Sequence, residues 1–417
     1  MSHQEVEKIE EIEKIEEIEK IEEIEKIEKI DKIDTVIDGS GRMLTYNHEE
    51  GPIVLQNENL IHRRRIPFMN VFLPVGYPAS VTDDYTPYQI YDSLQAFSST
   101  IAGLLSSRAV LQGFGVGDST SSATAAVLLT VLQECTGRLA TILFAHRCGQ
   151  AFQPECKFYR FLADIVNDGA LFLDILAPAL PTYSKVLALC AAGTLRAICG
   201  VSGGAAKAAL SAHFAKDGNI AELNAKDSSQ ETVISLLGML VGSVFLHFVH
   251  SKSAVLASMV VLITTHLLTN YEAVRSVQMT TLNKQRLCIL LDHYKATGLL
   301  TSPKEVAAKE NIMNWVSPPI SFADRFPGEG EISADDIAKT RDRGYIITSH
   351  GGHKMIWLKK VMDTEKPHAL QAWIEAYTGE YWPIDDSKWD SAVQFGWDIA
   401  TNALLTRPSS LVVMEEA

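Results

Sequence analysis

The chain has 417 residues and a hydrophobic fraction of 47%, enough for two domains and a sizeable core. Its formal net charge of −14 at pH 7 argues against nucleic-acid binding, because that function needs a positively charged surface. The six cysteines contain no Cys-x-x-Cys pair, which favours buried reduced thiols over a disulfide framework or a zinc site. Charged residues near the N-terminus argue against a secretory signal, so we do not expect a secreted protein.

Residues 1–38 form an acidic low-complexity tail that carries nine of the 14 net negative charges. Isoleucine recurs at every third position from Ile9 to Ile33, between glutamates and lysines. A period of three does not match the alternating steps of a heptad, so this is only coiled-coil-like. Because Glu and Lys are good helix formers, we predict a solvated helical tail that extends to Ile37. A partner-binding tail is the alternative.

A helical core is predicted over residues 43–300. Its first part, 43–72, reads as strand and loop, and the proline-rich segment 73–87 cannot be one continuous helix. Helices are then expected over 88–107, 120–147, 157–176 and 183–215.

A glycine-rich run, Gly113–Thr124, opens the second of these helices and includes Asp118. A glycine loop that enters a helix N-terminus can hold an anion. The P-loop lysine is missing, however, and no convincing strand precedes the run. The favoured interpretation is therefore a capped helix start.

An apolar hairpin over 232–271 is the main membrane signal. Thr232–Ser251 and Ser253–Tyr271 carry no formal charge, and each is long enough to cross a ~30 Å hydrocarbon layer. A capping box over Ser228–Glu231 predicts that the first helix begins near Ser228. Gly238 and Gly242 form a Gly-xxx-Gly face for close helix packing. The alternative is a hairpin buried in a soluble bundle.

The remaining chain has an ordinary soluble composition. We predict an amphipathic helix over 279–297, a linker region over 301–329 with a capping box at Ser302, and a small α+β domain over 330–417. In that domain two alternating runs flank Gly351 and Gly352, which predicts a β-hairpin. Helices are expected near 364–378 and 387–405.

Several polar residues lie inside apolar helical segments and are candidates to line a ligand cavity. Asp164 and Asp168 are one helical turn apart, so they share a face and could hold Mg²⁺, although an ion pair with Arg160, Arg138 or Arg196 is favoured. His247, His250 and His266 could line a proton path or metal site between the paired apolar helices. Buried, hydrogen-bonded histidine is favoured, and no metal is assigned. The full candidate set is Asp118, Glu134, Arg138, Asp164, Asp168, Arg196, Lys226 and Asp227.

The sequence resembles the RUS (root UVB sensitive) family over about residues 73–300. The resemblance rests on seven runs in the family's order: 73–78, 85–97, 115–120, 136–138, 164–168, 225–232 and 270–275. It implies membrane association and, in plants, links to UV-B responses, early development, auxin transport and vitamin B6 balance. It brings no established catalytic residues. A pyridoxal cofactor on Lys226 is less favoured because no phosphate-binding loop adjoins it, so the cofactor stays unknown.

We therefore expect a mainly α protein: an apolar, membrane-associated helical bundle with a small C-terminal α+β domain. Its polar cavity would bind a small anionic or amphipathic molecule, and the protein would act as a carrier, scaffold or regulator. The alternative is a membrane-bound enzyme that uses the same cavity for a lipid-like or phosphorylated substrate. The sequence leaves open a homo-oligomer or a hetero-oligomer with another RUS-family protein, and it does not identify the organelle.

Overall fold

The computed structural model describes residues 33–37, 43–47, 51–53, 69–113, 123–216, 218–313, 318–325, 327–328, 331–359, 368–383 and 386–412. The chain divides into two compact units, Met1–Ser80 and Val81–Ala417. Asp118, with residues 114–122 of the glycine-rich run, lies outside the described residues, as do residues 1–32 of the predicted tail.

The first unit contains a three-stranded antiparallel sheet of β1 (Ile33–Ile37), β2 (Met43–Asn47) and β3 (Gly51–Ile53), followed by the short helix α2 (Met69–Phe72). The predicted helix was wrong over Ile33–Ile37. Here the repeat has given way to an alternating run of β-branched residues, which suits an antiparallel strand better than a helix. Helix α2 also differs from the loop expected there.

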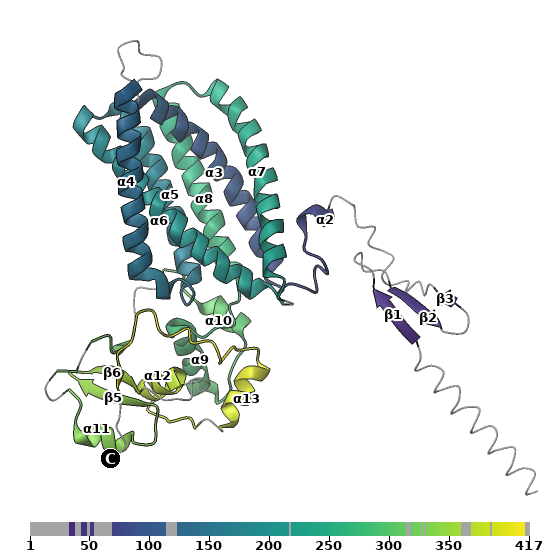
Figure 1. The fold of residues 1–417 in the computed structure, drawn as a ribbon, viewed down its shortest axis with the longest axis vertical. Coiled ribbons are helices and arrows are strands. Elements are labelled where there is room, and N and C mark those ends of the chain that lie inside the picture. Colours follow the sequence, from purple (N-terminus) through teal and green to yellow (C-terminus); the bar gives the residue numbers. More distant parts are fainter. Residues whose placement is uncertain are drawn as a thin grey trace, which may run out of the picture. The chain divides into compact units, whose positions relative to one another are not determined.

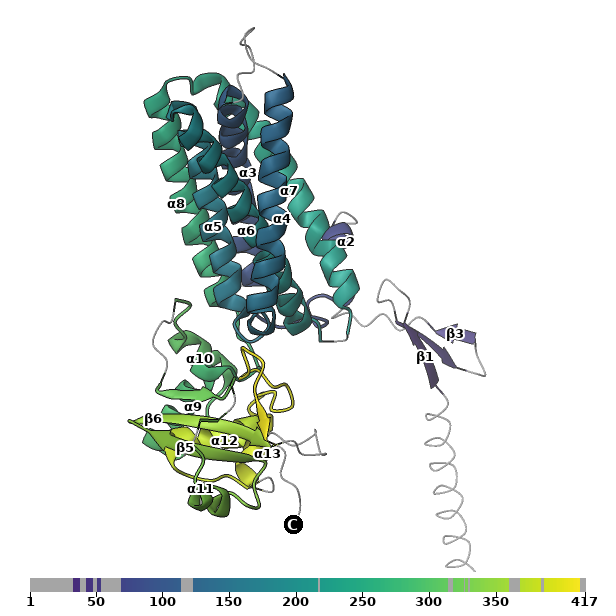
Figure 2. The same ribbon diagram turned by 60° about the vertical axis from the view of Figure 1, so that its left-hand side comes forward.

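Six long helices form a bundle in the second unit, where they run side by side (Figures 1 and 2). They are α3 (Tyr85–Gly113), α4 (Ala123–Cys148), α5 (Cys156–Leu176), α6 (Thr182–Phe214), α7 (Ile220–Phe248) and α8 (Lys252–Ser276). By length and composition α4, α6, α7 and α8 could each cross a membrane. The predicted mainly α fold class is confirmed.

The two helices of the apolar hairpin pack along α3, which lies between them (Figure 1). The Gly238–Gly242 face of α7 meets α3 so closely that a Cβ on Gly238 would lie 2.9 Å from Cβ of Thr100. The hairpin predicted from the sequence has its two apolar helices paired with each other, whereas in the structure each packs mainly against α3. Close packing needs small residues on one helix only, and α3 supplies the partner.

Helix α7 begins eight residues before the predicted start at Ser228. The hydroxyl of Ser229 donates to the carbonyl of Ala225, and that of Thr232 donates to the carbonyl of Ser228. These groups thus bond backward within a helix that has already begun, which is the alternative role of such side chains. The preceding residues include good helix formers, so the helix begins at Ile220, with Asn219 as its N-cap.

A second core is built from the C-terminal part. It contains helices α9 (Lys284–Thr297), α10 (Pro303–Lys309), α11 (Ala334–Lys339), α12 (His368–Thr378) and α13 (Ser387–Gln394), and strands β4 (Ile320–Phe322), β5 (Tyr345–His350), β6 (His353–Lys359) and β7 (Leu411–Val412). β5 and β6 form the predicted hairpin, and both turn glycines have positive φ. Strands β4 and β7 pair with β6 in parallel.

Residues from the predicted linker enter this core. Val306 of α10 and Ile320 of β4 are buried with Leu291, Tyr345 and Trp373. The predicted helix over 387–405 ends at Gln394, because Gly396 takes a positive φ of 92° that terminates it. The boundary between helical core and α+β domain stays a prediction.

We predict that Gly238→Ala destabilises the chain relative to Gly103→Ala. Both glycines lie in long helices, so both changes gain the same helix propensity, but a Cβ at Gly103 meets nothing within 4 Å. The difference should be about 1–3 kcal/mol, the usual cost of overpacking. Thermal unfolding of both variants in one detergent measures it, and equal midpoints would contradict the close α3–α7 contact.

Candidate functional site

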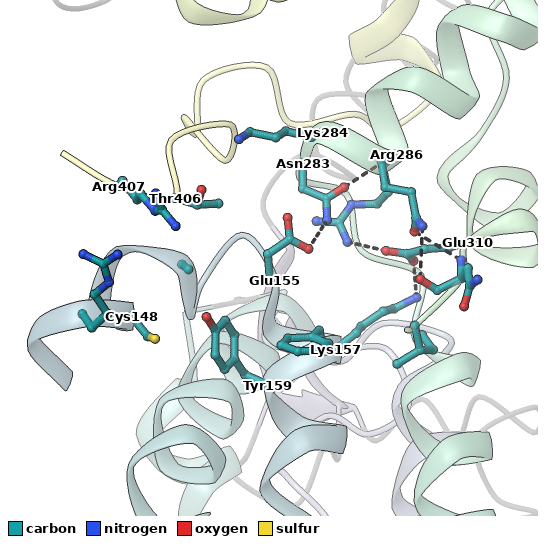
Figure 3. Close-up of a pocket in the computed structure, with 16 residues that line it drawn as sticks. Cys148, Glu155, Lys157, Tyr159, Asn283, Lys284, Arg286, Glu310, Thr406 and Arg407 are labelled. Carbon is teal, nitrogen blue, oxygen red and sulfur yellow. Dashed lines mark hydrogen bonds and ion pairs between the residues drawn. The ribbon is translucent and has the colours of Figure 1, made fainter. Parts of the chain in front are cut away.

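A pocket of about 340 Å³ lies where the end of α4 and the start of α5 meet the start of α9 and the segment that follows α10 (Figure 3). Its lining includes Arg147 and Cys148 from the end of α4, Glu155 and Tyr159 around the start of α5, and Thr406 and Arg407 from the C-terminal segment. The volume suits a small molecule. Of the cavity residues proposed from the sequence, those that the structure describes do not line it.

A buried ionic trio holds one wall of the pocket together (Figure 3). The carboxylate of Glu310 accepts from Nζ of Lys157 at 2.6 Å and from Nη1 of Arg286 at 2.9 Å, and each side chain is at most 4% exposed. Burial alone would raise the pKa of Glu310, but Arg286 and Lys157 hold it below its usual value. The trio therefore joins α5, α9 and α10.

Asn283 is the N-cap of α9, and it holds a second part of the pocket wall in place. Its Oδ1 accepts from the backbone N–H of Arg286 at 2.8 Å, which satisfies a donor in the first helical turn. Its Nδ2 donates to Oε2 of Glu155 at 2.9 Å. Burial raises the pKa of Glu155, while Arg286 opposes the shift. Both pocket carboxylates are thus already engaged by the protein.

Cationic groups outnumber carboxylates around the pocket. The five cations are Arg147, Lys157, Lys284, Arg286 and Arg407, against Glu155 and Glu310. Burial lowers the pKa of Lys284, and Arg407 lowers it further while Glu155 opposes them. A bound anion would reduce the repulsion among these cations and replace the water that they lose, so the arrangement can hold a phosphate or carboxylate group.

A separate polar network lies inside the helical bundle. Arg160 of α5 contacts Oδ2 of Asp164 through Nη1 at 2.9 Å, and Oδ1 of Asp92 on α3 through Nη2 at 2.8 Å. Asn270 of α8 donates to Asp164 and, at 3.1 Å, to Oε1 of Gln95 on α3. These bonds connect three helices, and they confirm the predicted pairing of Asp164 with Arg160.

Two further buried carboxylates of α5 have specific partners. Nδ1 of His266 lies 2.8 Å from Oδ2 of Asp168, so the predicted hydrogen-bonded histidine is confirmed at this position. Asp174 pairs with Arg196 of α6 and accepts from Oγ of Ser106 at 2.6 Å. Since Asp164 and Asp168 bind Arg160 and His266, these contacts do not support the Mg²⁺ alternative. The part of the chain that the structure describes contains no group of three or more His, Cys, Asp or Glu side chains placed to hold a metal ion.

The other predicted residues lie apart from this network. Glu134 and Arg138 are exposed on α4 and pair with each other at 3.6 Å. Asp227 of α7 is buried and accepts from Lys207 of α6 at 2.6 Å, with half-buried Lys226 beside it. His247 and His250 are exposed, whereas His266 is buried, so these three histidines do not form one site. The cavity that the sequence analysis placed among these polar residues stays a prediction.

Sequence reasoning missed the residues of the pocket. Arg147, Lys284 and Arg407 belong to segments that are more than 100 residues apart, so no local spacing connects them. The amphipathic helix predicted over 279–297 begins only at Lys284 in the structure, and Asn283 is its N-cap. An asparagine at this place was the available signal, because it marks a helix N-terminus.

Comparison with known proteins gives a consistent result over the bundle. A family model described as the vitamin B6 photo-protection and homoeostasis domain matches residues 61–298. The chain is 37% identical over 247 residues to RUS family member 1 of Dictyostelium discoideum, which covers 58% of this chain and 47% of that protein. It is 35% identical over 246 residues to protein root UVB sensitive 3 of Arabidopsis thaliana, which covers 59% and 56%.

The matched segment spans about half the length of these curated relatives. No solved structure matches the chain.

We predict that Glu310→Gln loosens the junction between the bundle and α9–α10. The change leaves Lys157 and Arg286 buried without their carboxylate, which should cost about 3–5 kcal/mol. The matched control is Glu272→Gln, which removes an exposed pair with Arg275 and should cost less than about 1 kcal/mol. Thermal unfolding compares them, and equal midpoints would contradict a structural role for the trio.

The same trio should make the junction acid-sensitive. The folded-state pKa of Glu310 is lowered below its ordinary value of 4.5, so its stabilisation is present above that value. It is lost as the pH falls through the folded-state pKa. Limited proteolysis of the junction across this range should show increased cleavage on acidification, and the increase should be absent in Glu310→Gln.

Proposed function

The chain belongs to the RUS family, and we propose that it is a membrane-associated protein that binds a small anionic molecule as a carrier, scaffold or regulator. The observation that carries the proposal is the excess of cationic side chains around the pocket of α4, α5 and α9. Glu155 and Glu310 are engaged by Asn283, Lys157 and Arg286, so an added anion would find Arg147, Lys284 and Arg407 at the wall.

The family model's description supports a phosphorylated form of vitamin B6 as the first ligand to test. Such a molecule joins a phosphate to a small aromatic ring. Charged groups at the wall suit the phosphate, and Phe158 and Tyr159 line the same pocket and suit the ring. Lys284 has a further partner in Trp373, whose ring centre lies 5.5 Å from Nζ.

The surface of the bundle supports the membrane part of the proposal. Large apolar residues are exposed along α7, including Leu236, Leu240 and Val244, with exposed fractions of 51%, 67% and 62%. Water does not favour so continuous an apolar helix face, whereas hydrocarbon does. Four helices of the bundle have the length and composition to span a bilayer.

We predict that the full chain stays in the membrane pellet after alkaline carbonate extraction and is released by detergent. An embedded apolar surface resists carbonate, whereas a protein held to the membrane by charge alone does not. A monodisperse chain in the carbonate supernatant would contradict membrane embedding and leave the anion pocket as the function of a soluble bundle.

We predict that Lys284→Ala weakens binding of pyridoxal 5′-phosphate by about tenfold or more, because it removes one charge-assisted contact worth roughly 1.4 kcal/mol. Isothermal titration of the purified full chain measures the affinity. Lys295→Ala is the matched control, because Lys295 lies on the same helix over the ring of Tyr377 and does not line the pocket.

Titration with pyridoxal phosphate, pyridoxal and inorganic phosphate shows which part of the ligand the pocket recognises. Tighter binding of pyridoxal phosphate than of either pyridoxal or inorganic phosphate would support a site for both parts of the molecule. Equal binding of inorganic phosphate would support a general anion site. Equal affinities of Lys284→Ala, Lys295→Ala and the unaltered chain, or no binding of any of the three ligands, would contradict the pocket as the ligand site.

A further inference from the structure

One face of α4 combines two kinds of side chain that do not suit the same surroundings. The helix packs against α6, where a Cβ on Gly137 would lie 3.4 Å from the carbonyl oxygen of Gly193. Away from α6, the helix exposes Val127, Leu128, Val131, Leu132, Leu139, Ile142 and Leu143. Midway along this face lie Glu134 and Arg138, whose side chains are 65% and 79% exposed. We call these nine residues the outer face of α4.

Neither water nor lipid satisfies the outer face. In water, its seven large apolar side chains form a continuous hydrophobic strip. In a bilayer, the ion pair would lie near the middle of a 26-residue helix, and among the described residues its two charged groups contact each other at 3.6 Å and no other charged group. The mismatch exists in both solvents, so it does not depend on the membrane association proposed above.

Helix α7 provides a direct comparison. Its exposed apolar strip contains Leu236, Leu240 and Val244, and the whole segment Thr232–Ser251 carries no formal charge. That strip is uniform and suits hydrocarbon as it stands. The outer face of α4 differs from this strip by its central ion pair. A protein surface packed against the face would supply partners for both charges, which hydrocarbon does not.

We propose that the outer face of α4 is the contact between two copies of this chain. Glu134 and Arg138 lie one turn apart on one face, so the face carries a carboxylate and a guanidinium in fixed order. In a parallel helix pair about a twofold axis, Glu134 can reach Arg138 of the partner subunit, and the reverse contact forms by symmetry. The face is therefore complementary to itself in charge and in apolar character.

Crosslinking at Val127 tests this contact. Val127 lies seven residues, almost two helical turns, before Glu134, so it shares the same side of α4, and a parallel pair brings its two copies near the axis, within the reach of a disulfide. Cys135 is exposed but lies about 100° further around the helix, so Cys135→Ser removes it first. Copper phenanthroline oxidation of Val127→Cys with Cys135→Ser in native membranes should give a species of twice 45.9 kDa, and Cys135→Ser alone should give none.

The control places a cysteine on the uniform strip. Val244→Cys, made together with Cys135→Ser, has a comparable exposure of 62% at the replaced position but lies on α7. It should give little crosslinked product. No product from Val127→Cys, or equal product from both positions, overturns the assignment of the outer face.

A charge exchange tests the pairing itself. Glu134→Arg leaves two arginines on the face, and Arg138→Glu leaves two glutamates, so each variant repels its own copy. Co-expressed with different tags, the two variants should copurify at least about tenfold more than either does with itself, because like charges across a contact cost several kcal/mol. In each variant the two charges on one helix have the same sign, so the ion pair within the helix is lost in both variants. A preference for the mixed pair can therefore come only from contacts between copies.

Unselective copurification overturns the proposed pairing. So does a monomeric mass for the unaltered chain in nanodiscs, or copurification with a different RUS-family protein in place of a second copy. Carbonate extraction and ligand titration have their own readouts, so failure of the membrane or ligand proposal is distinguishable from failure of this one.

Discussion

The buried guanidinium of Arg160 is the constraint on which the bundle depends. A charge taken out of water must be paired and its donors must be used, or the cost in free energy is several kcal/mol. Arg160 meets Asp92 and Gln95 of α3 and Asp164 of α5, and Asn270 of α8 closes the set. Only one register of these helices brings all five side chains together. Apolar packing alone would tolerate other registers, because helices that are apolar on most faces can slide and rotate.

Other polar contacts repeat this logic through the bundle. His266 of α8 meets Asp168 of α5, Arg196 of α6 meets Asp174 of α5, and His213 of α6 lies 2.9 Å from Asp84. The first and the last connect segments that are about 100 or more residues apart, and the second fixes the two consecutive helices α5 and α6 against each other. Three of the residues that the sequence analysis named as cavity candidates, Asp164, Asp168 and Arg196, each contact a residue of another helix. The glycines of α7 set how closely it approaches α3.

The cationic pocket occurs where the bundle meets the second core. Helix ends and loops gather there, so charged side chains can remain partly solvated while the trio of Lys157, Arg286 and Glu310 holds the two parts together. Such a site can form from side chains at the edges of both parts while the packing of each hydrophobic core stays the same. Its charge balance depends on side chains from both parts, so the contacts that hold the junction together also shape the pocket.

Much of this architecture followed from the sequence. The long apolar helices, the β-hairpin at Gly351 and Gly352, the end of α9 at Thr297 and the Ser302 cap of α10 were all predicted, because each depends on neighbours within a few residues. Local signals also misled. Ser228 has the pattern of a cap but lies inside α7, since the residues before it already form a helix.

The sequence by itself determined where the long helices of the bundle lie, which of them are apolar, and that polar groups inside them need partners. It did so because helix length, hydrophobicity and turn chemistry are properties of short segments. Only the tertiary structure decided which residues are those partners and that α3 separates α7 from α8. It alone also brings Arg147, Lys284 and Arg407 to one pocket. Contacts between residues more than 100 positions apart are set by how whole helices pack, and no local pattern encodes that choice.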